Sequence, residues 1–259
     1  MQQEKSNMLS SVILTKNEEK NIVGCLESIK WSNEIIVIDD NSEDRTVENA
    51  QKFGANVFKH SLDDDFSRQR NFGLSKAKGN WLLFVDADER VSDELKNEII
   101  DLTTQSDRIR QLNAYFIKRT DFMWGKELKH GETGNIKLLR LAKKGCGKWK
   151  GKVHEKWLVR GKVGQLKNPL YHYPHQSMTE FLKKISYYTD LRVKELCEKK
   201  VKAQWWSIIL YPKAKFIVNY FIKRGFLDGI SGLIHALMMS FHSFLVRGKL
   251  WIWKGKEEK

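Results

Sequence analysis

The segment WLLFVDADE, residues 81–89, decides the fold class of this chain. The run Trp81–Val85 has strand length, and a run without charges is typical of a parallel strand that is buried on both faces. Asp86 and Asp88 follow two residues apart, so in an extended segment both side chains point to the same side. Ligands of open α/β sheets bind beyond the carboxyl ends of the strands. Two carboxylates there favour a divalent cation and nucleotide phosphates, although taken alone they also fit an acidic turn.

Strands and helices alternate from residue 9 to about residue 105, to either side of this segment. Apolar runs between polar turns predict the strands, and apolar residues at helical spacing predict the helices. The expected strands are Ser11–Leu14, Glu34–Ile38, Val57–Phe58 and the run from Trp81. The expected helices are capped by Asn17, run through Val47 and Ala50, span Phe66–Ala77 and are capped by Ser92. Strands separated by helices form βαβ units and therefore a parallel sheet with right-handed connections.

Between about residues 113 and 175 strands no longer alternate with helices. Strands are expected at 114–117, 136–141 and 156–159, and the glycine-rich segment 145–151 is expected to be a flexible approach to Val153-His154-Glu155. From Ser177 onward the pattern is helical, because apolar residues recur on one stripe. The stripe consists of Phe181, Ile185, Tyr188 and Leu191.

The composition predicts a cytosolic protein with an anionic partner. The 259 residues carry a formal net charge of +14, which suits nucleotide phosphates, nucleic acid or an acidic membrane surface. Cys25, Cys146 and Cys197 are too few and too far apart for a disulfide framework or a metal-ligand motif, so we expect a reducing compartment. The first apolar run is short, and we expect no signal peptide.

Three acidic groups lie at or just after the ends of expected parallel strands. They are Lys16-Asn17-Glu18, Asp39-Asp40 and Asp86-Ala87-Asp88, and the basic segment Arg68–Gly73 lies between the last two. Carboxylates accept hydrogen bonds from a base or ribose, arginine pairs with a diphosphate, and a metal ion bridges the two. Taken singly, Asp39-Asp40 also fits a turn, and Arg70 also fits a solvated helix residue. The order of the acidic groups and the basic segment along the chain favours a nucleotide site instead.

The same motifs resemble those of family 2 glycosyltransferases with the GT-A fold. The resemblance rests on Ser11-Val12-Ile13 with Asn17-Glu18, Ile36–Asp44, Arg70–Gly73 with Ala77 and Gly79, and Asp86–Glu89. Gly151–Glu155 and Lys223–Gly229 resemble the narrower group of bacterial lipopolysaccharide-core β-glycosyltransferases. The resemblance implies a mostly parallel, Rossmann-like α/β sheet with helices on both faces, followed by a helical membrane-associating region. We divide the chain into a GT-A domain at residues 1–175, with a nucleotide-binding half at 9–105 and an acceptor half at 106–175, and a C-terminal region at 176–259.

The resemblance also implies roles for single residues. The implied nucleotide-binding residues are Thr15, Asn17, Glu18, Asp40, Arg70 and Asp86. Asp40 would accept a hydrogen bond from a uracil-type base, and Arg70 would face the base or the diphosphate. Asp86 would contact the ribose or the metal, and Asp88 would bind a divalent cation, Mn²⁺ or Mg²⁺, directly. Thr15 and Glu18 fit helix capping equally well.

The catalytic base is expected at Glu155. Inverting sugar transfer needs a carboxylate that deprotonates the acceptor hydroxyl, whereas the metal neutralises the departing nucleoside diphosphate. Related transferases have an acidic base downstream of the Asp-x-Asp motif, often after Glu; here His154 precedes Glu155 instead. The alternative is that Glu155 is one charge in a lysine-rich strand. His154 or His172 would complete the metal site or bind phosphate, and packing or surface roles fit these histidines as well.

The last third of the chain explains the positive charge. From residue 196 onward lysine and arginine outnumber the acids, and Trp205, Trp206, Trp251 and Trp253 lie among them. This composition favours attachment to an anionic membrane surface at headgroup depth. The uncharged run 229–246 contains serine and histidine and is marginal for a spanning helix. A helical cap on the core and a transmembrane helix are the alternatives.

We therefore expect an inverting, metal-dependent hexosyltransferase that is peripheral to the cytoplasmic face of the plasma membrane. Its donor would be a nucleotide-sugar, UDP-linked, and its acceptor a glycan or glycolipid of the lipopolysaccharide core or a related envelope saccharide. The alternative is a basic protein that binds nucleic acid or lipid without catalysis. No nucleic-acid partner is expected, because no helix-turn-helix, zinc-finger or RRM signature is present. A nucleotidyltransferase would need a glycine-rich phosphate loop after the first strand, and Leu14–Glu18 contains no glycine.

Overall fold

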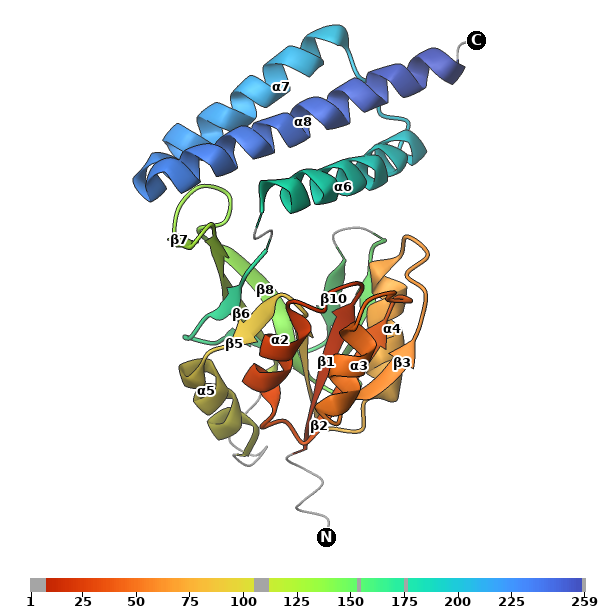
Figure 1. Cartoon of the computed structure of the whole chain (residues 1–259), viewed down its shortest axis with the longest axis vertical. Helices are drawn as coiled ribbons and strands as arrows, with labels where there is room; N and C mark the ends of the chain where they lie inside the picture. The colour runs from red at the N-terminus through yellow and green to blue at the C-terminus, as the bar shows by residue number, and fades with distance from the viewer. Residues whose placement is uncertain (1–7, 105–111, 153–154, 175–176, 258–259) are drawn as a thin grey trace. The chain divides into compact units, whose positions relative to one another are not determined.

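The computed structural model describes residues 8–104, 112–152, 155–174 and 177–257. It divides the chain into two compact units, which Figure 1 shows in one view. The first unit comprises Met1–Arg119 and Lys137–His172, and the second comprises Thr120–Ile136 and Tyr173–Lys259. The short segment Thr120–Ile136 therefore belongs with the C-terminal helices, although it is distant from them in the sequence.

Four parallel strands form one side of the sheet in the first unit, with β3 (Asn56–Lys59) at its edge. In spatial order they are β3, β2 (Glu34–Asp39), β1 (Leu9–Thr15) and β4 (Trp81–Asp86). β1 pairs on both sides, so that Leu14 lies opposite Ile38 of β2 and opposite Asp86 of β4. The carboxyl ends of β1, β2 and β4 consequently finish at one edge of the sheet. The expected α/β class with a parallel, Rossmann-like sheet is confirmed.

Apolar side chains pack on both faces of these strands. The elements that cover them are α2 (Ile22–Ile29), α3 (Thr46–Lys52), α4 (Phe66–Lys76), α5 (Asp93–Thr104), β9 (Gly147–Lys150) and β10 (Lys156–Val159). Ile13 and Val37 belong to a core that includes buried residues of α2, α3 and α5. Val12 and Phe84 belong to the opposite core, with side chains of α4 and of the β9–β10 hairpin. Burial on both faces explains why the interiors of β1, β2 and β4 are uncharged.

The first helix begins later than the sequence predicts. Asn17 does not cap it, because α2 begins at Ile22 and Asn17 adopts a left-handed backbone with φ of 51°. The N–H of Asn17 donates to Ser42 Oγ over 2.9 Å, and its Oδ1 accepts from the N–H of Glu43 over 2.8 Å. The loop after β2 therefore takes the polar groups that a helix start would use.

Beyond β4 the sheet becomes mixed. The strands that continue it are β8 (Ile136–Lys143), β6 (Leu112–Met123), β12 (Leu170–His172) and β5 (Glu89–Val91), with β7 (Lys126–Leu128) and β11 (Lys162–Gln165) beside β6. β8 is antiparallel to β4, and β12 is antiparallel to β5. The glycine-rich segment 145–151, expected to be flexible, instead contains β9. Trp149 and Trp157 are paired across the β9–β10 hairpin and stack with ring centroids 5.2 Å apart, which explains the order of this segment.

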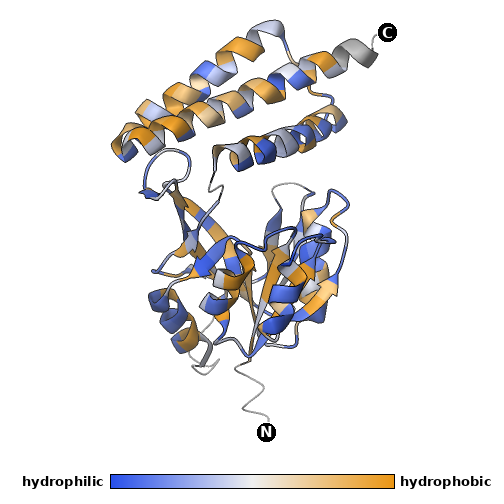
Figure 2. Ribbon diagram, viewed as in Figure 1, coloured by the Kyte–Doolittle hydropathy of each residue, from blue (hydrophilic) through white to orange (hydrophobic). Residues whose placement is uncertain are grey.

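Helices dominate the second unit. They are α6 (Met178–Glu198), α7 (Trp205–Ile217) and α8 (Gly229–Glu257), with the short turns η1 (Val218–Ile222) and η2 (Gly225–Asp228) between α7 and α8. Both α6 and α7 pack against α8, and apolar residues run along α7 and α8 (Figure 2). Within Gly225–Trp253, an 18-residue window has a mean hydropathy of 1.5 and is 22% buried, so by length and composition this helix is a candidate membrane-associating region.

Candidate active site

The carboxyl ends of the central strands bring sequence-predicted residues to one edge of the sheet. Thr15 lies opposite Asp39 in the β1–β2 register, and Leu14 lies opposite Asp86 in the β1–β4 register. Asp40 follows directly, with its N–H donating to the carbonyl of Thr15 over 2.9 Å. Because ligands bind at this edge of parallel sheets, these residues form the start of the candidate site.

The two neighbouring carboxylates after β2 have different surroundings. Asp39 is fully buried, and its carboxylate accepts hydrogen bonds from the N–H and Oγ of Ser42, which closes the turn. Asp40 is paired through Oδ2 with Lys16 Nζ at 2.8 Å, and its Oδ1 accepts from the N–H of Leu62 over 2.9 Å. Asp39 therefore shapes the loop, and Asp40 is the member of the pair at the candidate site.

Of the three predicted residues at the end of β1 and just beyond it, Thr15 differs from the other two. Its buried Oγ1 has no hydrogen-bond partner among the residues that the structure describes. Asn17 is exposed and bonds to the loop after β2, while the N–H of Glu18 donates to Thr46 Oγ1 over 2.8 Å. Glu18 Oε2 also accepts from Asn21 Nδ2 over 2.7 Å. Asn17 and Glu18 thus organise the loop, whereas the Thr15 hydroxyl has no structural partner in the described part of the chain.

Arg70 lies at the centre of the candidate site. It is only 5% exposed on α4, so its interpretation as a solvated helix residue is wrong. Its Nε donates to Glu155 Oε1 over 2.7 Å, and its Nη2 donates to Asp86 Oδ1 over 3.0 Å. The guanidinium also lies 4.7 Å from the ring centre of Trp149. One buried cation therefore joins the Asp-x-Asp motif to the expected base.

Arg140 is a site residue that the sequence analysis missed. It lies on β8, is 4% exposed, and its Nη2 contacts both the Asp86 carboxylate and Glu89 Oε1, the latter at 3.2 Å. Asp86, predicted as a nucleotide and metal ligand, is here paired with Arg70 and Arg140. The available signal was an arginine within the apolar run LLRLA at residues 138–142, where a buried cation needs a carboxylate partner.

Burial and the arginines shift the pKa values of this network in opposite directions. Burial opposes ionisation of Asp86, but Arg140 and Arg70 outweigh it and hold the pKa of that carboxyl well below its usual range. Burial raises the pKa of Glu89, and Arg140 offsets only part of that effect. The pKa of Arg140 is raised by Asp86 and Glu89 despite its burial. Asp86 is therefore an anion at neutral pH.

Asp88 and His172 form a second pair beside this network. Asp88 Oδ2 and His172 Nε2 lie 3.4 Å apart, and both side chains are largely buried. The pairing of β12 with β5 sets His172 opposite Glu89, which brings it to the Asp-x-Asp turn. Neighbouring ligands of an octahedral Mg²⁺-sized cation lie about 3 Å apart, so these atoms fit two positions around one ion.

The side chains that could bind a metal suit a cation that also binds a ligand. Among the described residues no group of three His, Cys, Asp or Glu side chains could hold a metal ion. Mg²⁺-type cations commonly take one or two protein ligands and fill the remaining positions with water and substrate phosphates. Asp88 and His172 meet this requirement, whereas Asp86 is bound by two arginines in this structure.

Glu155 precedes β10, and its side chain is largely buried at 14% exposure. Its Oε1 is held by Arg70, so the carboxylate has a fixed position beside the Asp-x-Asp motif. The alternative of one solvated charge in a lysine-rich strand does not describe this environment. His154, the other candidate for the metal site, lies outside the described residues.

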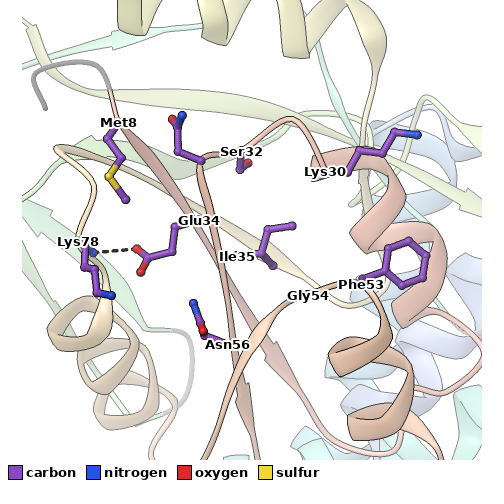
Figure 3. A pocket seen from close by; sticks show the side chains of 10 residues that line it. Met8, Lys30, Ser32, Glu34, Ile35, Phe53, Gly54, Asn56 and Lys78 are labelled. Atoms are coloured by element: carbon purple, nitrogen blue, oxygen red, sulfur yellow. Dashed lines mark hydrogen bonds between the residues drawn. The ribbon is translucent and has the colours of Figure 1, made fainter. Parts of the chain in front are cut away.

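A polar hollow of about 380 Å³ lies at the opposite end of the strands (Figure 3). Lys30, Glu34, Asn56 and Lys78 contribute to its lining. Glu34 begins β2 and accepts from the N–H of Lys78 over 2.8 Å. The hollow is therefore at the amino ends of the strands, and none of the predicted site residues lines it.

One protein family matches the part of the chain that contains most of these residues. The sequence model of glycosyl transferase family 2 matches residues 10–162. Lipopolysaccharide core biosynthesis glycosyltransferase LpsC of Rhizobium meliloti (strain 1021) is 27% identical over 250 residues, which cover 94% of this chain and 92% of that protein. The uncharacterized glycosyltransferase RT0209 of Rickettsia typhi is 29% identical over 254 residues, covering 93% of this chain and 86% of that protein.

Two solved structures show more distant similarity. Residues 1–349 of TarS from S. aureus align with a TM-score of 0.47 at 14% identity, covering 96% of this chain and 92% of that one. Glucosyl-3-phosphoglycerate synthase from Mycobacterium tuberculosis, in complex with Mn²⁺, UDP and glucosyl-3-phosphoglycerate, aligns with a TM-score of 0.37 at 21% identity. That alignment covers 48% of this chain and 47% of the synthase chain.

Proposed function

The chain belongs to glycosyl transferase family 2, and we propose that it transfers a hexose from a UDP-linked donor to a glycan or glycolipid, with inversion at the anomeric carbon. The observation that carries the proposal is the guanidinium of Arg70, which contacts both Asp86 and Glu155. This contact brings the Asp-x-Asp motif and the expected base into one site. Both motifs lie within the residues that the family model matches.

Donor binding is assigned to the ends of β1 and β2 and to Arg70. Each Asp40 carboxylate oxygen has one partner among the described residues, and a carboxylate offers about four acceptor positions. Asp40 can therefore accept the N–H of a uracil-type base. The buried Thr15 Oγ1 and Arg70 Nη1 have no partner in the described part of the chain, which supports a polar ligand beside each of them.

Asp88 and His172 are assigned to a divalent cation, Mn²⁺ or Mg²⁺. When bound, the cation would neutralise charge on the departing nucleoside diphosphate. Asp86 is kept anionic by Arg140 and Arg70 and is assigned to the ribose, and it becomes a metal ligand only if it exchanges an arginine partner. The protein therefore needs no acid of its own for the leaving group.

Glu155 is assigned as the general base. Its carboxylate takes the proton of the acceptor hydroxyl while that oxygen forms a bond to the anomeric carbon, and the bond from this carbon to the diphosphate oxygen breaks on the opposite face. Attack opposite the leaving group inverts the configuration, so that an α-linked donor gives a β-linked product. Arg70 fixes the position of the Glu155 carboxylate through the 2.7 Å hydrogen bond.

The acceptor is assigned to the lipopolysaccharide core or a related envelope saccharide at the cytoplasmic face of the plasma membrane. LpsC, whose name places it in lipopolysaccharide core biosynthesis, is similar to this chain over nearly the whole length of both. Exposed apolar side chains around the turn between α7 and α8, among them Phe221, Phe226 and Ile230, support peripheral attachment to a membrane. A glycolipid acceptor would be available there.

Glucose and galactose transfer to deacylated core oligosaccharides tests this function. The wild-type protein is incubated with UDP-glucose or UDP-galactose and Mn²⁺, and UDP release and product configuration are measured. We expect Glu155→Gln to lower kcat by about 10²–10⁴-fold with unchanged UDP affinity, while Glu27→Gln on the exposed side of α2 retains activity. An active Glu155→Gln enzyme would exclude Glu155 as the base.

A further inference from the structure

The turn between α7 and α8 exposes several large apolar side chains within a short stretch. They are Phe221, Ile222, Phe226, Leu227 and Ile230. Ile222 and Ile230 are 70% and 77% exposed, which leaves most of each side chain in solvent. We call residues 221–230 the tip. A contiguous group of exposed apolar side chains marks a protein or membrane interaction site, whereas single exposed apolar residues are common on any protein surface.

Two cations lie in the middle of the tip. Lys223 and Arg224 are exposed, and neither side chain makes a hydrogen bond or ion pair within the part of the chain that the structure describes. Arg224 has a left-handed backbone with φ of 57° at the turn between η1 and η2. Apolar side chains beside two exposed cations match the interface of an anionic bilayer, where apolar groups enter the acyl boundary and cations meet lipid phosphates.

Buried polar contacts hold the tip on its protein side. Asp228 is 3% exposed and accepts from the N–H of His130 over 2.8 Å, and it also contacts His130 Nδ1 at 2.8 Å. Lys126 Nζ donates to the carbonyl of Asp228 over 2.9 Å, and the N–H of Gly131 donates to the carbonyl of Lys223 over 2.9 Å. The tip is therefore a fixed element, so docking it onto a surface costs little conformational entropy.

We propose that the tip docks into the surface of an anionic phospholipid bilayer. The apolar side chains of the tip enter the interface, and Lys223 and Arg224 bind the phosphates of the lipid headgroups. The proposal deepens the membrane attachment proposed above and rests on it. It identifies which part of residues 205–253 touches the membrane and which lipid chemistry is recognised.

Polar contacts of α8 favour docking at the surface over a spanning helix. Lys249 Nζ on α8 lies 2.7 Å from Asp190 Oδ1 and 2.8 Å from Thr189 Oγ1 on α6. Ser240 Oγ donates to the carbonyl of Pro212 on α7 over 2.8 Å. A helix that crossed the bilayer alone would lose these partners, and its lysine would enter hydrocarbon. The contacts keep α8 within the helical layer, with the tip at the end of that layer.

Sedimentation with sucrose-loaded vesicles tests the tip directly. The full chain is mixed with phosphatidylglycerol–phosphatidylethanolamine vesicles or with phosphatidylcholine vesicles, and the bound fraction is measured against lipid concentration. The tip variant is Ile222→Ser/Leu227→Ser/Ile230→Ser. Its control is Ile209→Ser/Leu210→Ser on α7, because these apolar side chains are also exposed, at 49% and 54%, but lie outside the tip. The charge variant is Lys223→Gln/Arg224→Gln.

We expect the tip variant to bind anionic vesicles at least about tenfold more weakly than the wild type, because binding scales with the apolar area that is buried. The charge variant is expected to lose about fivefold per cation on anionic vesicles and nothing on phosphatidylcholine. The α7 control is expected to bind like the wild type. Wild-type binding by the tip variant, or an equal loss in the α7 control, would overturn the proposal.

Titration of each variant with UDP and Mn²⁺ separates this proposal from the proposed function. The tip is remote in sequence from every residue assigned to the donor, so each variant is expected to bind UDP like the wild type, which also shows that it is folded. Weak vesicle binding together with wild-type UDP affinity supports the tip. Failure of the wild-type protein itself to bind UDP would contradict the proposed function and leave the vesicle result intact.

Discussion

Arg70 Nε lies 2.7 Å from Glu155 Oε1, while Nη2 of the same guanidinium lies 3.0 Å from Asp86 Oδ1. The planar guanidinium donates in two directions at once, which the single ammonium of lysine does not reproduce. We expect Arg70→Lys to lower kcat by about 10²-fold, because a base displaced by about 1 Å loses its alignment with the acceptor hydroxyl. Steady-state kinetics with UDP-hexose and core oligosaccharide measure the effect.

Arg68→Lys is the control for this substitution. Arg68 is exposed on the same helix and pairs with Asp63 at 3.0 Å. The Arg68→Lys variant should retain wild-type kinetics. Equal activity of Arg70→Lys and Arg68→Lys would show that the Arg70 bridge has no role in positioning the base.

Arg140 is expected to stabilise the fold through the two carboxylates that it contacts. Arg140→Gln removes the buried cation that contacts Asp86 and Glu89. Removing one partner of a buried ion pair lowers the free energy of unfolding by about 3–5 kcal/mol. Urea unfolding of the variant measures the loss. Lys137→Gln, on the exposed side of the same strand, should leave stability unchanged. A variant at residue 140 as stable as this control would contradict the assigned network.

The stabilising effect of the Asp86 carboxylate should depend on pH. A carboxyl whose pKa is lower in the folded protein than in the unfolded chain stabilises the fold above its unfolded pKa, about 3.9 for Asp. That contribution is lost as the pH falls from there through the folded pKa. We expect the difference in unfolding free energy between wild type and Asp86→Asn to be largest above about pH 5 and to shrink toward pH 3. A difference that is constant over this range would contradict the assigned pKa shift.

Metal-dependent donor binding should require Asp88 and His172. Asp88→Asn is expected to weaken UDP binding in Mn²⁺ to the level of the wild type without metal, because the amide lacks the charge that binds the cation. His172→Gln should weaken it less, since Asp88 remains. Asp93→Asn, an exposed carboxylate in the first turn of α5, is the control. Calorimetric titration measures all three, and unchanged metal dependence in Asp88→Asn would refute the site.

The left-handed conformation of Asn17 can be tested with two substitutions that remove the same amide. Glycine adopts positive φ freely, whereas alanine at φ of 51° is strained by about 1 kcal/mol. We therefore expect Asn17→Ala to be less stable than Asn17→Gly by about this amount in urea unfolding. Equal stability of the two variants, or alanine the more stable, would contradict the left-handed conformation at this position.

The strands of the parallel sheet could be predicted because their environment is simple. The interior of a strand with both faces buried is an uncharged run, and residues 35–38 of Glu34–Asp39 and 81–85 of Trp81–Asp86 both follow this rule. The start of α2 could not be predicted in the same way. The partners of Asn17 lie 25 and 26 residues further along, so they compete with local helix capping only after the chain has folded.

Some residues of the candidate site could be predicted from the sequence, and others could not. Arg70, Asp86 and Glu155 stand out because they belong to motifs. Arg140 does not, since its role depends on the antiparallel pairing of β8 with β4. The closeness of His172 to Asp88 depends on the register of β12 against β5, which no spacing in the sequence reveals. The roles of all these residues in donor and metal binding are predictions.

Calorimetric titration of the wild-type protein with UDP, GDP and CDP, each with and without Mn²⁺, tests the central claim most directly. If the protein is a UDP-sugar-dependent transferase with a cation at Asp88 and His172, UDP will bind in the presence of Mn²⁺ and much more weakly without it. GDP and CDP should bind more weakly than UDP, because the Asp40 pocket is assigned to uracil. If no nucleotide binds with or without the metal, the assignment of a nucleotide-sugar donor is wrong.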